Sequence, residues 1–138
     1  MVSAEIKLYE GYNESEILSL YQSVGWSAYY SQPEVLRQAF SKSLCVISAY
    51  VSEELVGLAR LVGDGATVIF LQDILIKPAY QRQGIGTRLI AEVFRRYGHV
   101  RQIHLMTDDV PETVGFYQSV GFTSVEKLHF RAFTKLRY

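Results

Sequence analysis

The chain has 138 residues, 49% of them hydrophobic, and fourteen Lys and Arg residues balance fourteen Asp and Glu residues. This length predicts a single domain over residues 1–138, and the balanced charge argues against nucleic acid or an anionic membrane as a partner. No apolar run approaches the ~20 residues of a membrane span, the first residues lack a signal-peptide pattern, and Cys45 is the only cysteine, so we expect a cytoplasmic protein.

The first part of the chain predicts one strand and two helices. The stretch "EIKLYE" alternates apolar and polar residues, as a short strand does. From Asn13, a candidate N-cap, apolar residues recur at helical spacing until Gly25. Pro33 then opens a second helical pattern, "PEVLRQAFSKS".

The middle of the chain predicts an antiparallel meander. Three strand-like runs, "LCVISAYV", "ELVGLARLVGD" and "TVIFLQDILIK", are separated by the short turn sequences "SEE" and "DGA". Such short polar or glycine-bearing connections join neighbouring antiparallel strands.

The last part returns to alternating helices and strands. A helix follows Gly84, with Gly98 as an expected left-handed cap, and "RQIHLMT" predicts a strand. Pro111 opens a short helix, and one or two final strands are expected within residues 122–136. The predicted fold is mixed α/β (α+β), a mostly antiparallel central sheet flanked by helices in the order β-α-α-β-β-β-α-β-α-β(β).

A glycine-bearing loop, Gln81 to Gly86, opens directly into the helix that follows Gly84. A helix N-terminus carries unpaired N–H groups and the positive end of the helix dipole, and glycines let a phosphate approach the backbone. Arg82 and Arg88 are expected to add positive charge there. A pyrophosphate suits such a site, although a bare Gly-x-Gly also occurs in ordinary turns.

Two common phosphate-binding motifs do not fit this loop. A P-loop needs Lys-Ser/Thr after its second glycine, whereas Thr87-Arg88 follows Gly86, and its first glycine would stand at Gln81. A dinucleotide fingerprint needs a third glycine where Leu89 stands, and a parallel rather than an antiparallel strand before the loop.

Two motifs together resemble those of the GNAT superfamily of acetyl-CoA-dependent N-acetyltransferases. Gln81-x-x-Gly84-x-Gly86 matches the family's Gln/Arg-x-x-Gly-x-Gly/Ala loop, with "ILIKP" before it and a long helix after it. About thirty residues later, "GFYQSVGF" resembles the family's late aromatic-Tyr-x-x-x-Gly-Phe element. The predicted order of elements agrees along nearly the entire chain.

The resemblance implies acetyl-CoA as the co-substrate and assigns residues to its parts. The strand before the loop would splay from its neighbour and pair its backbone with the pantetheine arm, and the loop would bind the pyrophosphate. By analogy, the strand residues are Ile74, Leu75 and Ile76, and the loop residues are Arg82, Gln83, Gly84, Ile85, Gly86 and Thr87. Val110 stands where many relatives have a polar residue that touches the cofactor, so that contact is expected to be absent.

The resemblance also implies direct attack of a primary amine on the thioester through a tetrahedral intermediate. Tyr117 matches the family tyrosine that protonates the leaving thiolate, which makes it the predicted catalytic residue. Phe70 and Gln72 stand where relatives often carry Glu or His, and neither is a base. Asp73 is the nearest carboxylate, although strand alternation turns it away from Gln72; water held by Gln72 and the acids Asp108, Asp109 and Glu112 remain alternatives.

The acceptor site is expected between the first two helices, where the family builds its pocket. Trp26, Tyr29 and Tyr30 lie there, and we add Gln72 and Asp73 as candidate substrate residues. The aromatics equally suit a core cover or a dimer contact. A non-catalytic acetyl-CoA sensor or regulatory module is the alternative function. The family makes a homodimer an option, and the three histidines are not arranged in sequence as a metal site, so no metal is expected.

Overall fold

The structure is a computed structural model that describes residues 3–137, and it divides into two compact units. The first unit runs up to Met106 and the second begins at Thr107. The single domain expected from the sequence stays a prediction.

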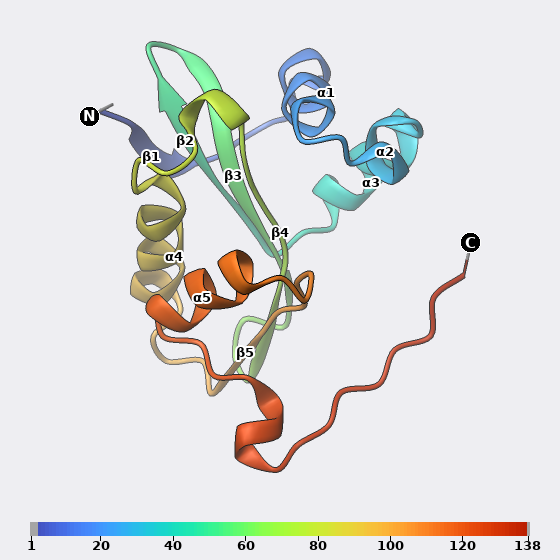
Figure 1. The fold of residues 1–138 in the computed structure, drawn as a ribbon. Helices are drawn as coiled ribbons and strands as arrows, with labels where there is room; N and C mark the ends of the chain where they lie inside the picture. Colours follow the sequence, from blue (N-terminus) through green and yellow to red (C-terminus); the bar gives the residue numbers. More distant parts are fainter. Residues whose placement is uncertain (1–2, 138) are drawn as a thin grey trace. The chain divides into compact units, whose positions relative to one another are not determined.

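The first unit is built on a five-stranded sheet in the order β1-β2-β3-β4-β5 (Figure 1). Neighbouring strands run antiparallel from β1 to β4, as the meander predicts, and β5 is parallel to β4. The strands are β1 (Glu5–Leu8), β2 (Cys45–Val51), β3 (Glu54–Gly63), β4 (Val68–Ile76) and β5 (Gln102–His104).

Helices cover both faces of this sheet, with α1, α2 and α3 on one side and α4 on the other (Figure 1). The side chain of Asn13 accepts a hydrogen bond from the backbone N–H of Glu16 at 3.2 Å, which confirms the expected cap of α1. The single-turn α2 lies in the connection between the first two predicted helices, where the sequence predicted neither a helix nor a strand. The helices are α1 (Glu14–Ser23), α2 (Ser27–Tyr30), α3 (Pro33–Ser41) and α4 (Ile85–Arg96).

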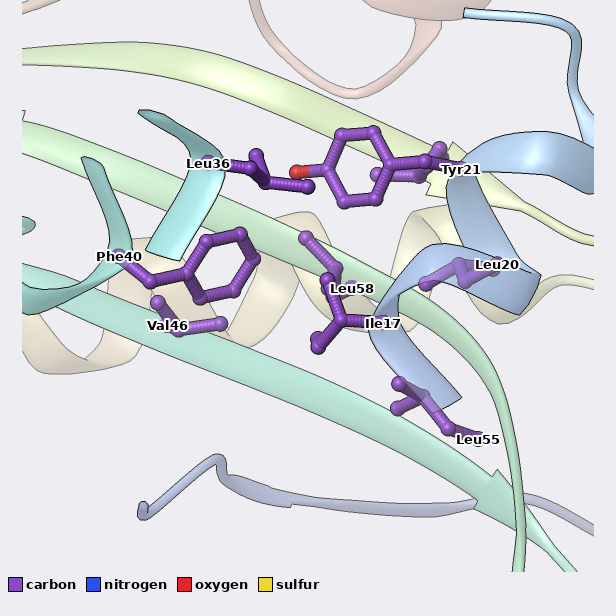
Figure 2. Close-up of a cluster of buried hydrophobic side chains, with 9 residues drawn as sticks. Ile17, Leu20, Tyr21, Leu36, Phe40, Val46, Leu55 and Leu58 are labelled. Atoms are coloured by element: carbon purple, nitrogen blue, oxygen red, sulfur yellow. The ribbon is translucent and has the colours of Figure 1, made fainter. Parts of the chain in front are cut away.

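The main apolar core lies between the sheet and the first helices (Figure 2). Side chains of α1 and α3 pack there against strands β2, β3 and β4. The apolar face of α4 covers the opposite side of the sheet, and its residues Ile85, Leu89, Ile90 and Val93 are buried. The core is formed by Ile17, Leu20, Tyr21, Leu36, Phe40, Val46, Leu55, Leu58 and Leu75.

A buried ion pair crosses from β3 to β4 beneath α1. Arg60 Nε donates to Asp73 Oδ2 at 2.7 Å, and Tyr21 Oη donates to the same oxygen at 2.8 Å. Burial, reinforced by the negative charge of Asp73, raises the pKa of the Tyr21 hydroxyl. Burial by itself would lower the pKa of Arg60, but the carboxylate outweighs it and raises that pKa. Three elements are therefore joined at one carboxylate.

The pairing of β3 with β4 shifts register beside this ion pair. Arg60 lies opposite Asp73 while Leu61 lies opposite Leu71, so Gln72 is an extra residue in β4. One extra residue in a strand is a β-bulge, which bends the strand and redirects its side chains. The bulge therefore lies within the segment that the sequence assigns to ligand contacts.

The expected left-handed cap at Gly98 is wrong, because no left-handed φ occurs there. A Cβ on Gly98 would lie 3.1 Å from the carbonyl oxygen of Phe94, so the close backbone approach explains this glycine better. The left-handed glycine of α4 is instead its N-cap, Gly84, with φ of 84°.

The second unit contains the predicted helix α5 (Pro111–Ser119) and a 3₁₀ helix, η2 (Val125–Leu128). The one or two final strands expected within residues 122–136 are wrong for this chain, because η2 occupies part of that range and residues 130–137 are extended without strand pairing. Alternating residues favour an extended chain, but a strand also needs a neighbouring backbone with which to form hydrogen bonds.

Replacing Asp73 with Ala is expected to lower the free energy of unfolding by about 3–5 kcal/mol, because Arg60 stays buried without its counter-charge. Urea unfolding followed by circular dichroism measures the loss. Glu5→Ala is the control, since Glu5 pairs with Lys7 at the surface and its loss costs under about 1 kcal/mol. Equal losses in the two variants would contradict a structural role for the buried pair.

Candidate functional site

Strand β4 separates from β5 after three residues, which leaves part of its backbone edge unpaired. The parallel ladder joins only Val68, Ile69 and Phe70 to β5. From Leu71 to Ile76, β4 pairs with β3 alone among the described strands. Alternate N–H and C=O groups along this edge are therefore free of the sheet, and an extended ligand with amide groups can pair with them.

The free edge leads directly into the glycine loop. After β4 the chain makes a short 3₁₀ helix, η1 (Pro78–Tyr80), and reaches Gln81. The side chain of Gln81 donates from Nε2 to the carbonyl oxygen of Ile76 at 3.0 Å, so the first residue of the motif ties the loop to the end of β4. At Gly84 an added Cβ would meet nothing within 4 Å, which leaves the start of α4 open.

The N-terminus of α4 has the features of an anion site. The first intrahelical bond runs from Arg88 N–H to the carbonyl of Gly84, so the N–H groups of Ile85, Gly86 and Thr87 precede the helical ladder. The first turn of α4, all of it described, carries no acidic side chain. Open N–H groups and the positive end of a twelve-residue helix together favour a phosphate.

Two side chains near the loop, those of Arg88 and Gln83, make contacts that differ from the roles expected of them at a phosphate site. Arg88 was expected to add charge at the loop, but its guanidinium donates from Nη1 to the carbonyl of Ala4 at 2.7 Å. The guanidinium of Arg88 therefore binds the N-terminal segment of the chain. Gln83 donates to the carbonyl of Ala79 at 3.4 Å, and its buried Oε1 finds no partner among the described residues. A ligand donor such as an amide N–H suits that oxygen better than a phosphate does.

Four of the five candidate substrate residues lie together at the bulge of β4. Gln72 Nε2 donates to Tyr29 Oη at 3.2 Å, and the ring of Tyr29 lies 6.0 Å from that of Trp26. Burial and then the charge of Asp73 raise the pKa of Tyr29. Tyr30 packs at the margin of the core, as Trp26 and Tyr29 also do. The aromatics thus cover the core and approach β4 at the same time.

Gln72 is exposed and Asp73 is buried, which agrees with the expected alternation, but Gln72 bonds to Tyr29 and the charge of Asp73 also raises the pKa of Tyr29. Asp73 is only 2% exposed, and its Oδ2 already accepts hydrogen bonds from Arg60 and Tyr21. Its geometry suits positioning better than direct contact with a substrate.

Tyr117 lies in the second unit, on α5. Its ring packs edge-to-face against Phe122 at 5.9 Å and against Phe116 at 5.1 Å. The hydroxyl makes no hydrogen bond to any residue in the described range, and burial raises the pKa of Tyr117 to about 12. The side chain is a neutral phenol at physiological pH, with its proton available for donation.

Sequence reasoning missed Arg60 and Tyr21 as supports of the site. A signal was present, because one cation stands in the apolar run "ELVGLARLVGD" and one acid in "TVIFLQDILIK". Lone opposite charges in neighbouring apolar strands indicate a buried pair. Nothing comparable marked Tyr21, since its spacing is that of any core residue of α1.

Within residues 3–137, no three His, Cys, Asp or Glu side chains gather in a way that would hold a metal ion. None of the helices in the described part of the chain is long and apolar enough to cross a membrane.

Comparisons with known proteins agree on one family. A family model described as an acetyltransferase (GNAT) domain matches residues 12–135. An uncharacterized ycf52-like N-acetyltransferase of Prochlorococcus marinus is 32% identical over 78% of this chain, and a ycf52 N-acetyltransferase of Gracilaria tenuistipitata var. liui is 30% identical over 80%. The matched regions cover 61% and 62% of those relatives, so this chain spans about three fifths of their length.

Solved structures share the fold. A GNAT family acetyltransferase from Streptococcus pneumoniae TIGR4 superposes with a TM-score of 0.88 at 37% identity, over 98% of both chains. An aminoglycoside N-acetyltransferase solved in complex with CoA has a TM-score of 0.69 at 20% identity, over 100% of this chain and 96% of that one, which is a likeness of fold. On the family model and these relatives, the chain belongs to the GNAT acetyltransferase family.

Proposed function

We propose that this protein is an N-acetyltransferase that moves the acetyl group of acetyl-CoA to a primary amine of a small molecule or a peptide. The observation that carries the proposal is the free edge of β4 leading into the open N-terminus of α4. An extended amide-bearing arm that ends in a pyrophosphate, as in acetyl-CoA, matches those two features in that order. The names of the relatives support the same activity.

The residues present fit acetyl-CoA as a substrate. The backbone of Ile74, Leu75 and Ile76 would pair with the pantetheine amides. Such backbone contacts are compatible with the packing of their apolar side chains against the rest of the protein. The pyrophosphate would accept from backbone N–H groups between Arg82 and Thr87, and the Thr87 hydroxyl adds a further donor. The unpartnered Oε1 of Gln83 gives an amide of the ligand an acceptor.

The reaction we propose is direct attack. The amine nitrogen bonds to the thioester carbon and gives a tetrahedral oxyanion, for which N–H groups of the bulged β4 edge are the proposed donors. The carbon–sulfur bond then breaks, its electron pair goes to sulfur, and the amine nitrogen loses a proton. The products are an amide and free CoA.

Tyr117 is the proposed donor to the leaving sulfur. A phenol whose pKa is about 12 stays protonated, but a thiol has a pKa of about 8.5, so full transfer of the Tyr117 proton to the thiolate would be uphill. A hydrogen bond that stabilises the departing thiolate is the better description, and water supplies the proton afterwards.

The acceptor is proposed to approach beside Trp26, Tyr29, Tyr30 and Gln72. Because Gln72 uses its Nε2 on Tyr29, its carbonyl Oε1 is left to accept a hydrogen bond from the amine or from a water that takes the proton. Asp73 supports this arrangement through Tyr29. A cytoplasmic location stays a prediction, because some plant relatives are named chloroplastic.

A non-catalytic acetyl-CoA sensor is the second candidate. One observation favours it: the carboxylate on β4, Asp73, is held by Arg60 and Tyr21 rather than left free as a base. A sensor would bind acetyl-CoA through the same loop and show no amine-dependent release of CoA.

Replacing Gly84 with Asn is expected to weaken acetyl-CoA binding at least about tenfold, because the new side chain occupies the open helix start. Asn tolerates the left-handed φ, so the fold persists. Isothermal titration calorimetry measures the dissociation constant. Gly11→Asn is the matched control, with φ of 74° and equally open space. Equal affinities in the two variants would count against the loop as the pyrophosphate site.

Replacing Tyr117 with Phe is expected to lower kcat about ten- to hundredfold without weakening acetyl-CoA binding, since only a hydrogen bond to the leaving sulfur is lost. Because the pKa of Tyr117 is about 12, the ratio of wild-type to variant kcat stays constant from about pH 7 to about pH 10, and falls only as the phenol ionises. Tyr12→Phe is the control, as its hydroxyl also lacks a partner among the described residues. Unchanged turnover would remove Tyr117 from the chemical step.

Replacing Tyr29 with Phe is expected to raise KM for the amine about three- to tenfold and to leave KM for acetyl-CoA unchanged. The ring keeps its contacts with Tyr21 and Trp26, but the amide of Gln72 loses the oxygen that orients it. Steady-state kinetics with each substrate varied in turn separate the two constants. A parallel rise in both would indicate general damage instead of a role at the acceptor.

A further inference from the structure

A short connection, from Lys77 through η1, joins the free edge of β4 to the glycine loop. The N–H of Lys77 donates to the carbonyl of Val56 on β3 at 2.7 Å, so the connection starts from the sheet. The N–H of Tyr80 donates to the carbonyl of Lys77 at 2.8 Å, and the N–H of Gln81 donates to the carbonyl of Pro78 at 3.3 Å. The loop begins where this connection ends, so the position of the loop depends on how η1 is held.

One carboxylate from outside the connection holds it at two points. Glu54, the first residue of β3, accepts from Lys77 Nζ at 3.0 Å through Oε2 and from Tyr80 Oη at 3.3 Å through Oε1. The negative charge of Glu54 raises the pKa of Tyr80, so the phenol keeps the proton that it donates. Lys77 Nζ also donates to Ser19 Oγ on α1 at 3.3 Å. The Glu54 clamp, formed by Glu54, Lys77 and Tyr80, therefore spans η1 from the residue before it to its last residue.

The turn between β2 and β3 presents Glu54 at a defined place. Val51 pairs with Glu54, and the two residues between them, Ser52 and Glu53, both have left-handed φ, of 48° and 69°. A two-residue turn of this kind fixes the register of the hairpin. Glu53 makes no hydrogen bond or ion pair to a described residue. Two adjacent acids therefore differ in one respect: Glu54 holds η1 and Glu53 does not.

An acid close to the glycine loop has two opposing effects on acetyl-CoA, which is a polyanion. The negative charge of Glu54 repels the phosphates and by itself weakens binding. The contacts of Glu54 with Lys77 and Tyr80 order the connection before the ligand arrives, and a preorganised site binds more tightly because it loses less freedom on binding. We propose that the second effect is the larger, and that Glu54 is a positioning residue for the loop that binds the pyrophosphate. This inference rests on the proposed function.

Titration calorimetry with acetyl-CoA separates the two effects by their sign. Glu54→Ala is expected to raise the dissociation constant about three- to tenfold, a modest change because the Glu54 side chain is 47% exposed. In steady-state kinetics KM for acetyl-CoA rises to the same extent, and kcat and KM for the amine stay unchanged. Glu53→Ala is the control: it removes the same charge one residue earlier, and its affinity is expected to be unchanged or slightly higher. Binding by Glu54→Ala that is as tight as binding by Glu53→Ala would overturn the proposal.

Hydrogen exchange of the free protein tests the Glu54 clamp without a ligand. The N–H groups of Tyr80 and Gln81 are bonded within the connection, and in Glu54→Ala they are expected to exchange at least about threefold faster than in the wild type. In Glu53→Ala they exchange at the wild-type rate, and Tyr80→Phe, which removes one of the two contacts, gives an intermediate rate. Equal exchange in Glu54→Ala and the wild type would overturn the proposal. Absence of acetyl-CoA binding by the wild type would overturn the proposed function and the positioning role together, and faster exchange without binding identifies that case.

Discussion

The buried carboxylate of Asp73 is the constraint on which the candidate site depends. It accepts from Arg60 on β3 and from Tyr21 on α1, so one group joins a helix to two strands. A buried pair is costly to desolvate, and it persists because each partner would otherwise be left as an unpaired charge. The pair lies beside the bulge at which Gln72 leaves the β3–β4 ladder. Loss of the carboxylate is therefore expected to disturb both the fold and the geometry at Gln72.

Strand β4 continues from the bulge to the glycine loop with one edge unpaired. Beyond Phe70 the strand has β3 on one side and no described strand on the other, and its last carbonyl accepts from Gln81 at the entrance of the loop. The residues of the Gln81–Gly86 motif therefore have two different roles. Gln81 holds the loop to the strand, and Gly84 at the start of α4 keeps the helix N–H groups accessible. A strand edge and a helix N-terminus joined in this way suit a long ligand with amides at one end and phosphates at the other.

The sequence predicted those features whose causes are local. The Asn13 cap of α1, the prolines that open α3 and α5, the meander and the start of α4 after Gly84 depend on residues near one another in the chain, and they were confirmed. The Arg60–Asp73 pair and the bulge at Gln72 depend on how two strands meet, which alternation does not reveal. The same limit explains the tail, because residues 130–137 have the pattern of a strand but no partner in the described chain.

The most direct measurement of the central claim is release of free thiol from acetyl-CoA by the purified protein, against a panel of small amines and peptides. The account predicts release that depends on the amine, with the acetylated amine as the second product. Acetyl-CoA binding without amine-dependent release from a broad panel would contradict the transferase and favour the sensor. Absence of acetyl-CoA binding would contradict the assignment of the β4 edge and the loop to this ligand.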